Sequence, residues 1–199
     1  MIAPRLIVVT DTTRGGDMVR RITEVCVRAR GGTVLVQLRD KELGARQRLE
    51  LGRELRAITR RTGQLLAVND RIDLADLLDA DALHLGEQSV GVDDARKLWG
   101  ERSVLRASHD PSAGAGGADG VVLSPIIAPR HGAPALGLAA LQKARSALGR
   151  VRLFALGGVD AGSARACLDA GADGVAVIGA VLDGQDDGPL LAALGTLTS

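Results

Sequence analysis

The sequence predicts an α/β protein, a single small (β/α)8 barrel that spans residues 1–199. Eight short apolar runs recur along the chain, each suited to a buried strand. Helix-like stretches separate these runs, and no linker or break in composition marks a second domain. Strands that alternate with helices imply a parallel sheet with right-handed crossovers, and eight such units close into a barrel of the TIM type.

The predicted strands are distributed over the whole chain. They are residues 6–10 (LIVVT), 34–38 (VLVQL), 65–68 (LLAV), 82–85 (ALHL), 104–105 (VL), 120–124 (GVVLS), 151–155 (VRLFA) and 174–178 (GVAVI). The clearest predicted helix covers residues 45–62, where apolar residues recur at helical spacing beside a basic, solvated face.

A weak internal repeat supports the barrel. The segments DADALHLG (79–86), GADGVVLS (117–124) and GADGVAVIG (171–179) each place Ala-Asp just before a short strand. This is expected where a helix ends and the chain re-enters the barrel. The alternative architecture, an open doubly wound sheet, calls for a glycine-rich fingerprint after the first strand, which TDTTRGGD (10–17) matches only vaguely.

Composition excludes several classes of partner. The apolar fraction is 46%, the charged fraction 25% and the net charge +1, so no global field favours nucleic acid or an anionic membrane. Phe154 and Trp99 are the only aromatic residues, which argues against recognition of single-stranded nucleic acid by base stacking. We therefore expect small-molecule ligands, with no nucleic acid and no membrane; a homo-oligomer is compatible with the sequence.

The amino-terminal segment and the cysteines indicate a cytoplasmic, reducing setting. MIAPRLIVVTD enters a strand-like run without a basic region followed by an apolar one, and no stretch approaches the length of a membrane span. Cys26 and Cys167 lie far apart in predicted helices, so we expect buried thiols rather than a disulfide or a nucleophile.

Polar residues follow the predicted strands. In such a barrel the carboxyl ends of the strands meet at one mouth, where active sites form. The residues expected there are Asp11, Gln37, Arg39, Lys41, Asn69, Asp70, Arg71, His84, Glu87, Ser89, Ser108, His109, Ser124, Gly157, Gly158 and Gly179.

Two features of this mouth predict anion binding. LGGVD (156–160) and the glycines of 171–179 follow or frame the last two strands, where barrels build phosphate cradles from backbone N–H groups, although glycines could also merely turn the chain. Gln37, Arg39 and Lys41 alternate and therefore point to one side, which suggests a second anion more strongly than a solvated edge.

Asp70 and His84 are further candidates. Asp70 at a strand end could bind Mg²⁺, which takes one or two carboxylates together with substrate phosphates and water. His84 lies within a strand, and a satisfied core residue and a substrate-orienting residue are equally good interpretations. The residues alone thus predict a small barrel that binds a phosphorylated ligand and a second anion, a pattern that suits chemistry on a diphosphate.

Seven motifs, in register over nearly the whole chain, resemble thiamine-phosphate synthase and its relative, the thiazole tautomerase. They are QLRDK (37–41), NDRIDLA (69–75), LHLGEQS (83–89), ASHD (107–110), LSPI (123–126), LGGV (156–159) and GADGVAVIGA (171–180). The synthase, as the resemblance implies, joins hydroxymethylpyrimidine diphosphate to a thiazole phosphate and releases pyrophosphate. The leaving group departs first in large part, and the thiazole nitrogen captures the pyrimidine cation.

The resemblance also implies roles for particular residues. Gln37, Arg39, Lys41 and Asn69 would hold the pyrimidine diphosphate, Asp70 would bind Mg²⁺, and His84 would border the pyrimidine pocket. Ser108 would contact the pyrophosphate. Gly158 and the backbone of Ile178 and Gly179 would cradle the thiazole phosphate.

Two positions depart from the synthase pattern. Ser89 stands where a second metal-binding aspartate is usual, with Glu87 nearby, and the loop 124–137 has Arg130 and His131 but no lysine. Arg130 could replace the lysine's charge. In the tautomerase the catalytic histidine follows the sixth strand, where this chain has Pro125, so His131 would have to act as the general base. Retention of the diphosphate residues favours the synthase; the alternatives are a tautomerase-like isomerase and a non-catalytic barrel that binds thiazole phosphate or thiamine phosphate.

Overall fold

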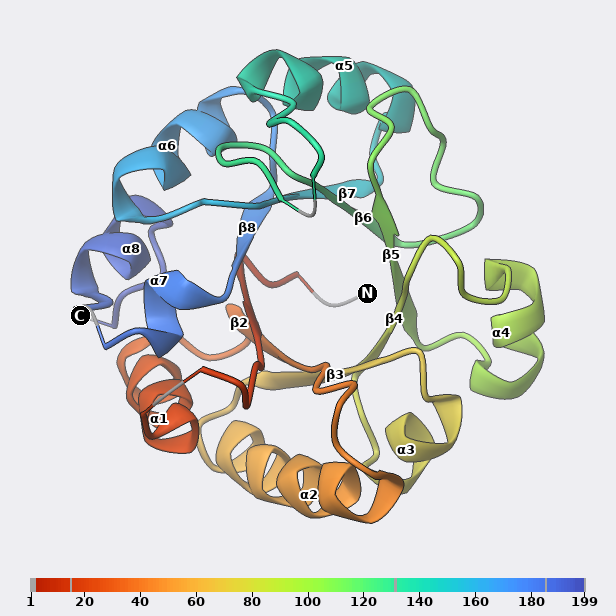
Figure 1. Ribbon diagram of the computed structural model, residues 1–199, viewed down its shortest axis with the longest axis vertical. Helices are drawn as coiled ribbons and strands as arrows, with labels where there is room; N and C mark the ends of the chain where they lie inside the picture. The colour runs from red at the N-terminus through yellow and green to blue at the C-terminus, as the bar shows by residue number, and fades with distance from the viewer. Residues whose placement is uncertain (1–2, 15, 131, 185, 199) are drawn as a thin grey trace.

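The computed structural model describes residues 3–14, 16–130, 132–184 and 186–198, and it confirms the predicted barrel. Parallel strands close in sequence order, with β1 hydrogen-bonded to both β2 and β8, and the helices form an outer ring (Figure 1). The strands are β1 (Leu6–Val9), β2 (Val34–Leu38), β3 (Leu65–Asn69), β4 (Ala82–Leu85), β5 (Ser103–Ser108), β6 (Gly120–Leu123), β7 (Arg152–Leu156) and β8 (Gly174–Val177).

Among the described residues, the helices follow the expected alternation with two exceptions: none lies between β5 and β6, and two follow β8. They are α1 (Met18–Arg28), α2 (Ala45–Arg61), α3 (Ile72–Leu77), α4 (Val92–Trp99), α5 (Leu138–Leu148), α6 (Ala161–Asp169), α7 (Gly179–Leu182) and α8 (Gly188–Ala193). The described residues 109–119 between β5 and β6 (HDPSAGAGGAD) form turns without a helix, because proline and closely spaced glycines disfavour one. None of the described helices is long and apolar enough to cross a membrane.

Apolar side chains fill two layers. One lies between the strands and the helices and includes the free, buried thiols of Cys26 and Cys167, as expected. The other fills the barrel interior, where Phe154 packs among smaller aliphatic side chains such as Ile7, Leu35 and Leu105. The interior is therefore a packed core that closes the barrel beneath its mouth.

The Ala-Asp repeat has the same structural role at three strand starts. The carboxylate of Asp81, just before β4, accepts the backbone N–H of Leu66 in β3 at 2.8 Å and pairs with Arg56 of α2 at 2.7 Å. Asp119 and Asp173 repeat this arrangement before β6 and β8, with the N–H groups of Val104 and Leu153 and with Arg96 and Arg145. We call Asp81, Asp119 and Asp173 the strand-start aspartates. Each joins a helix and two neighbouring strands at the end of the barrel opposite the mouth.

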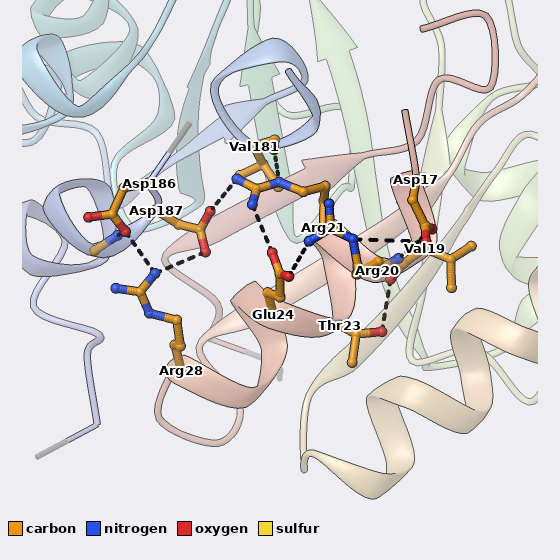
Figure 2. Close-up of polar contacts among 11 residues, drawn as sticks. Asp17, Val19, Arg20, Arg21, Thr23, Glu24, Arg28, Val181, Asp186 and Asp187 are labelled. Atoms are coloured by element: carbon orange, nitrogen blue, oxygen red, sulfur yellow. Dashed lines mark hydrogen bonds and ion pairs between the residues drawn. The ribbon is translucent and has the colours of Figure 1, made fainter. Parts of the chain in front are cut away.

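Ion pairs connect α1 to the segment that leads into α8. Arg21 lies between Glu24 and Asp187 (Figure 2). Its nitrogens are 2.8 Å from a Glu24 oxygen and 3.2 Å from an Asp187 oxygen. Arg28 pairs with Asp186 and lies 3.6 Å from Asp187. Burial raises the pKa of Asp187, although both arginines act in the opposite direction. The contacts hold the first and last helices of the ring together.

Candidate active site

The carboxyl ends of the strands surround a cavity of about 210 Å³. Its polar lining consists of Gln37, Arg39, Lys41, Asn69, His84, Glu87, His109, Ser124 and Arg130. Gln37, Arg39 and Lys41 share this face, as their alternation on an extended chain requires. The intervening Asp40 points the other way, where it accepts hydrogen bonds from the Thr10 hydroxyl and the Thr12 N–H and fixes the end of β2 against that of β1.

Buried polar atoms without partners face this cavity. Gln37 Nε2 donates to Asn69 Oδ1 at 3.2 Å, but Gln37 Oε1 has no hydrogen-bond partner among the described residues. Neither ring nitrogen of His84, which is 6% exposed, has one either. Burial lowers the pKa of His84 to about 4, so the imidazole is neutral at physiological pH and can both donate and accept. Because buried polar groups are rarely left unpaired, these atoms suit a ligand ring that carries donors and acceptors.

Asp70 is held in one orientation at the end of β3. Its backbone has a φ of +60°, an uncommon conformation for a residue other than glycine. The Ser89 hydroxyl and the Gly86 N–H (3.1 Å) donate to Oδ1, and Asn69 Nδ2 donates to Oδ2 at 2.6 Å. Lys41 Nζ lies 3.4 Å from Oδ2. Burial alone would raise the pKa of Asp70, but Ser89, Gly86 and Lys41 lower it below its usual value, so the side chain is a carboxylate at neutral pH.

This donor set fits a magnesium ion shared with a substrate. Among the described residues, no group of three or more His, Cys, Asp or Glu side chains could hold a metal. Mg²⁺ needs fewer, since it commonly binds through one or two carboxylates plus substrate phosphates. The Asp70 carboxylate lines an open cavity together with Lys41 and Ser89, which leaves room for a diphosphate beside it.

Glu87 is engaged by a histidine from the next strand end. Its carboxylate accepts the His109 backbone N–H at 2.6 Å and lies 2.7 Å from His109 Nδ1. Burial would raise the pKa of Glu87, but the His109 hydrogen bonds lower it overall. The sequence analysis did not anticipate this pair, because the contact depends on how residues 86–91 and 109–119 turn.

A second cavity, of about 410 Å³, lies at the ends of β7 and β8. Gly157 and Gly158 line it with φ values of +104° and +73°, and a Cβ at Gly158 would lie 2.5 Å from that of Ala128. Glycine is therefore required where the loop after β7 meets the loop after β6.

Ile178 and Gly179 line the opposite wall, and Arg130 lines both this cavity and the first. Burial lowers the pKa of Arg130, and the positive charges of Arg39 and Arg14 add to the effect.

Ser108, whose contact with pyrophosphate stays a prediction, is engaged within its own loop. Its hydroxyl donates to the Asp110 carbonyl at 3.1 Å and accepts the Asp110 N–H at 3.2 Å, and it does not line the mouth cavity. Its neighbours Ala107 and His109 do, because alternate residues of β5 face the barrel axis. His131 lies outside the described residues. A residue that the sequence analysis missed, Arg14, lines the second cavity.

Comparisons with known proteins agree with this geometry. A family model described as thiamine monophosphate synthase matches residues 6–181. The chain is 40% identical to the thiamine-phosphate synthase of Methanoregula boonei over 191 residues, which cover 92% of this chain and 87% of that protein. It is 38% identical to the thiamine-phosphate synthase of Moorella thermoacetica over 165 residues, 78% of each chain. A solved structure of thiamine phosphate pyrophosphorylase from Pyrococcus furiosus superposes with a TM-score of 0.85 at 27% identity, covering 98% of this chain and 96% of that one.

Proposed function

The chain belongs to the thiamine monophosphate synthase family, and from that membership we propose that it is a thiamine-phosphate synthase. It would join hydroxymethylpyrimidine diphosphate to a thiazole phosphate and release pyrophosphate; with the thiazole phosphate carboxylate as substrate, CO2 would be released as well. The observation that carries the proposal is the arrangement of the mouth. A ring-sized cavity with the unpaired atoms of Gln37 and His84 lies between a cationic site around Lys41 and a glycine cradle.

The first part of the reaction concerns the diphosphate. Gln37, Asn69 and the neutral His84 would bind the pyrimidine ring edge. Arg39 and Lys41 would neutralise the charge that develops on the pyrophosphate as its bond to the pyrimidine methylene carbon breaks. Asp70 would hold a Mg²⁺ that, when bound, supplies further positive charge to the leaving group.

The second part concerns the thiazole. Gly158, Ile178 and Gly179 would hold its phosphate in the second cavity. Leu156, Ile178 and Arg130 line both cavities, so the two substrates would lie next to each other. The thiazole nitrogen would then form its bond to the methylene carbon once the pyrophosphate has largely departed. Catalysis would therefore consist of positioning and electrostatic stabilisation.

The diphosphate site is the feature that favours a synthase over the tautomerase. A tautomerase handles a thiazole phosphate carboxylate and has no use for the Arg39, Lys41 and Asp70 group. A non-catalytic binder would retain the glycine cradle but form no product. We place the reaction in the cytoplasm, in keeping with the free thiols of Cys26 and Cys167.

The direct test incubates the purified protein with both substrates and Mg²⁺ and converts thiamine phosphate to fluorescent thiochrome. We expect product that depends on Mg²⁺. We also expect Arg39→Gln to lower kcat/KM for the pyrimidine diphosphate about 100-fold, in the range measured for loss of a group that stabilises a developing anion. Arg53→Gln, at an exposed arginine of α2, should leave it unchanged. Binding of the thiazole phosphate without product would refute the synthase and leave the tautomerase-like isomerase and the non-catalytic binder.

A further inference from the structure

Arg14 lies in the loop after β1 and reaches the glycine cradle. The Asp11 carboxylate shapes this loop by accepting the Thr13 hydroxyl at 2.5 Å and its N–H at 3.2 Å. The Arg14 N–H donates to the Asp11 carbonyl at 3.2 Å, which closes the turn. The guanidinium is thereby directed to the cavity that Gly158, Ile178 and Gly179 line.

The guanidinium of Arg14 is held against the backbone of that cradle by carboxylates. Its Nη1 lies 2.5 and 2.6 Å from the two carboxylate oxygens of Asp183, and its Nε lies 3.4 Å from Asp11. A Cβ added at Gly179 would come within 2.9 Å of this Nη1 and 2.5 Å of an Asp183 oxygen. The absence of a side chain at residue 179 therefore makes room for the Arg14–Asp183 pair.

The charges that line the cavity are unfavourable for a phosphate unless Arg14 offsets them. Asp11, Asp160 and Asp183 contribute carboxylates, whereas Arg14 and Arg130 contribute the positive charges. Asp160 is occupied as the N-cap of α6, where it accepts the Ser163 N–H at 3.0 Å. Asp11 and Asp183 are the carboxylates that Arg14 neutralises.

We propose that Arg14 is a phosphate-binding residue of the glycine cradle, which exchanges its contact with Asp183 for the phosphate of the thiazole substrate while it continues to offset Asp11. This inference rests on the proposed function and deepens it. The exchange is favourable because an exposed ion pair contributes little, whereas a guanidinium forms strong bidentate hydrogen bonds to phosphate. The Arg14 and Asp183 side chains are 38% and 48% exposed, so their pair is the weak kind.

The test measures binding and turnover separately. Calorimetry gives the Kd for thiazole phosphate and for the unphosphorylated thiazole alcohol, and steady-state kinetics give KM and kcat. Arg14→Gln should weaken thiazole phosphate binding about 10- to 100-fold, the range for loss of a charged hydrogen bond, with kcat within about twofold. KM for the pyrimidine diphosphate and the Kd for the alcohol should not change. Arg20→Gln, which removes an exposed arginine of α1 that pairs with Glu24, is the matched control.

Asp183→Asn tests for a gain in affinity for thiazole phosphate, which damage to the fold would not produce. It removes a negative charge from the cavity and releases Arg14, so we expect it to tighten thiazole phosphate binding several-fold. Equal Kd values for wild type and Arg14→Gln would overturn the inference, as would an equal loss of affinity for the alcohol. If the protein forms product and Arg14→Gln changes neither KM nor kcat, the role of Arg14 is wrong but the synthase proposal stands. If thiazole phosphate binding depends on Arg14 but no product forms, the synthase proposal is wrong but the role of Arg14 stands.

Discussion

The strand-start aspartates yield a prediction about stability. Asp81 accepts the backbone N–H of Leu66 at 2.8 Å and pairs with Arg56 at 2.7 Å. Leu66 is fully buried, so Asp81→Ala leaves its N–H without the acceptor that the fold provides. An unsatisfied buried N–H costs about 1–3 kcal/mol, and the lost ion pair adds up to about 1 kcal/mol. We therefore expect Asp81→Ala to lower the free energy of unfolding by about 1–4 kcal/mol.

Asp81→Asn separates the two contributions. Its side-chain carbonyl can still accept the Leu66 N–H, so only the charge that faces Arg56 is lost, and the expected cost is about 1 kcal/mol. Asp169→Ala serves as the control, since Asp169 forms an exposed i,i+4 pair with Arg165. Its effect should stay within about 0.5 kcal/mol.

The assay is equilibrium unfolding in urea followed by circular dichroism, together with hydrogen exchange at the Leu66 amide. We expect Asp81→Ala to accelerate that exchange and Asp169→Ala to leave it unchanged. Asp81→Ala with a stability equal to that of Asp169→Ala would refute the role assigned to the strand-start aspartates.

Three further predictions concern the mouth. Ser89→Asp adds a second carboxylate beside Asp70, so half-maximal activity should need on the order of tenfold less Mg²⁺; an unchanged requirement would argue against a metal at this position. The pKa of His84 is lowered to about 4 from 6.5. As the pH falls below 6.5, the unfolded chain therefore takes up a proton at this histidine before the folded protein does, so the free energy of unfolding should decrease toward pH 4, by up to about 3 kcal/mol. His84→Gln should flatten this dependence in unfolding experiments from pH 4.5 to 7.5. Gly158→Ala should lower the free energy of unfolding by about 1–3 kcal/mol and raise KM for the thiazole phosphate. Gly149→Ala, at a φ of +57° with no described atom within 4 Å of the new Cβ, should leave KM unchanged.

Apolar runs were sufficient to predict the barrel, but not the limits of every strand. Only Val104 and Leu105 mark the fifth strand in the sequence, whereas β5 extends from Ser103 to Ser108. Arg106 and Ala107 join the strand because they lie in register with Val121 and Val122 of β6. Pairing with neighbouring strands thus extended β5 beyond its apolar signal.

Positions that follow an alternating pattern could be predicted for the site, whereas positions set by irregular turns could not. The alternation that begins at Gln37 in β2 continues through Arg39 and Lys41 just after the strand, and it correctly placed all three on the mouth. Ser108, at the end of β5, does not line the mouth cavity, whereas Ala107 and His109 on either side of it do. The contacts of Arg14 with Asp183 and of Glu87 with His109 join residues far apart in the chain through irregular turns, for which no periodic signal exists. The functional roles of all these residues stay predictions.

The strand-start aspartates also have a consequence for how this protein can evolve. They lie at the amino ends of β4, β6 and β8, whereas both ligand cavities lie at the carboxyl ends. Residues that hold the wall together and residues that select the ligand are thus different residues on separate faces. Selection for a new phosphorylated ligand can therefore replace the loops of the mouth without altering the contacts that keep the strands in register.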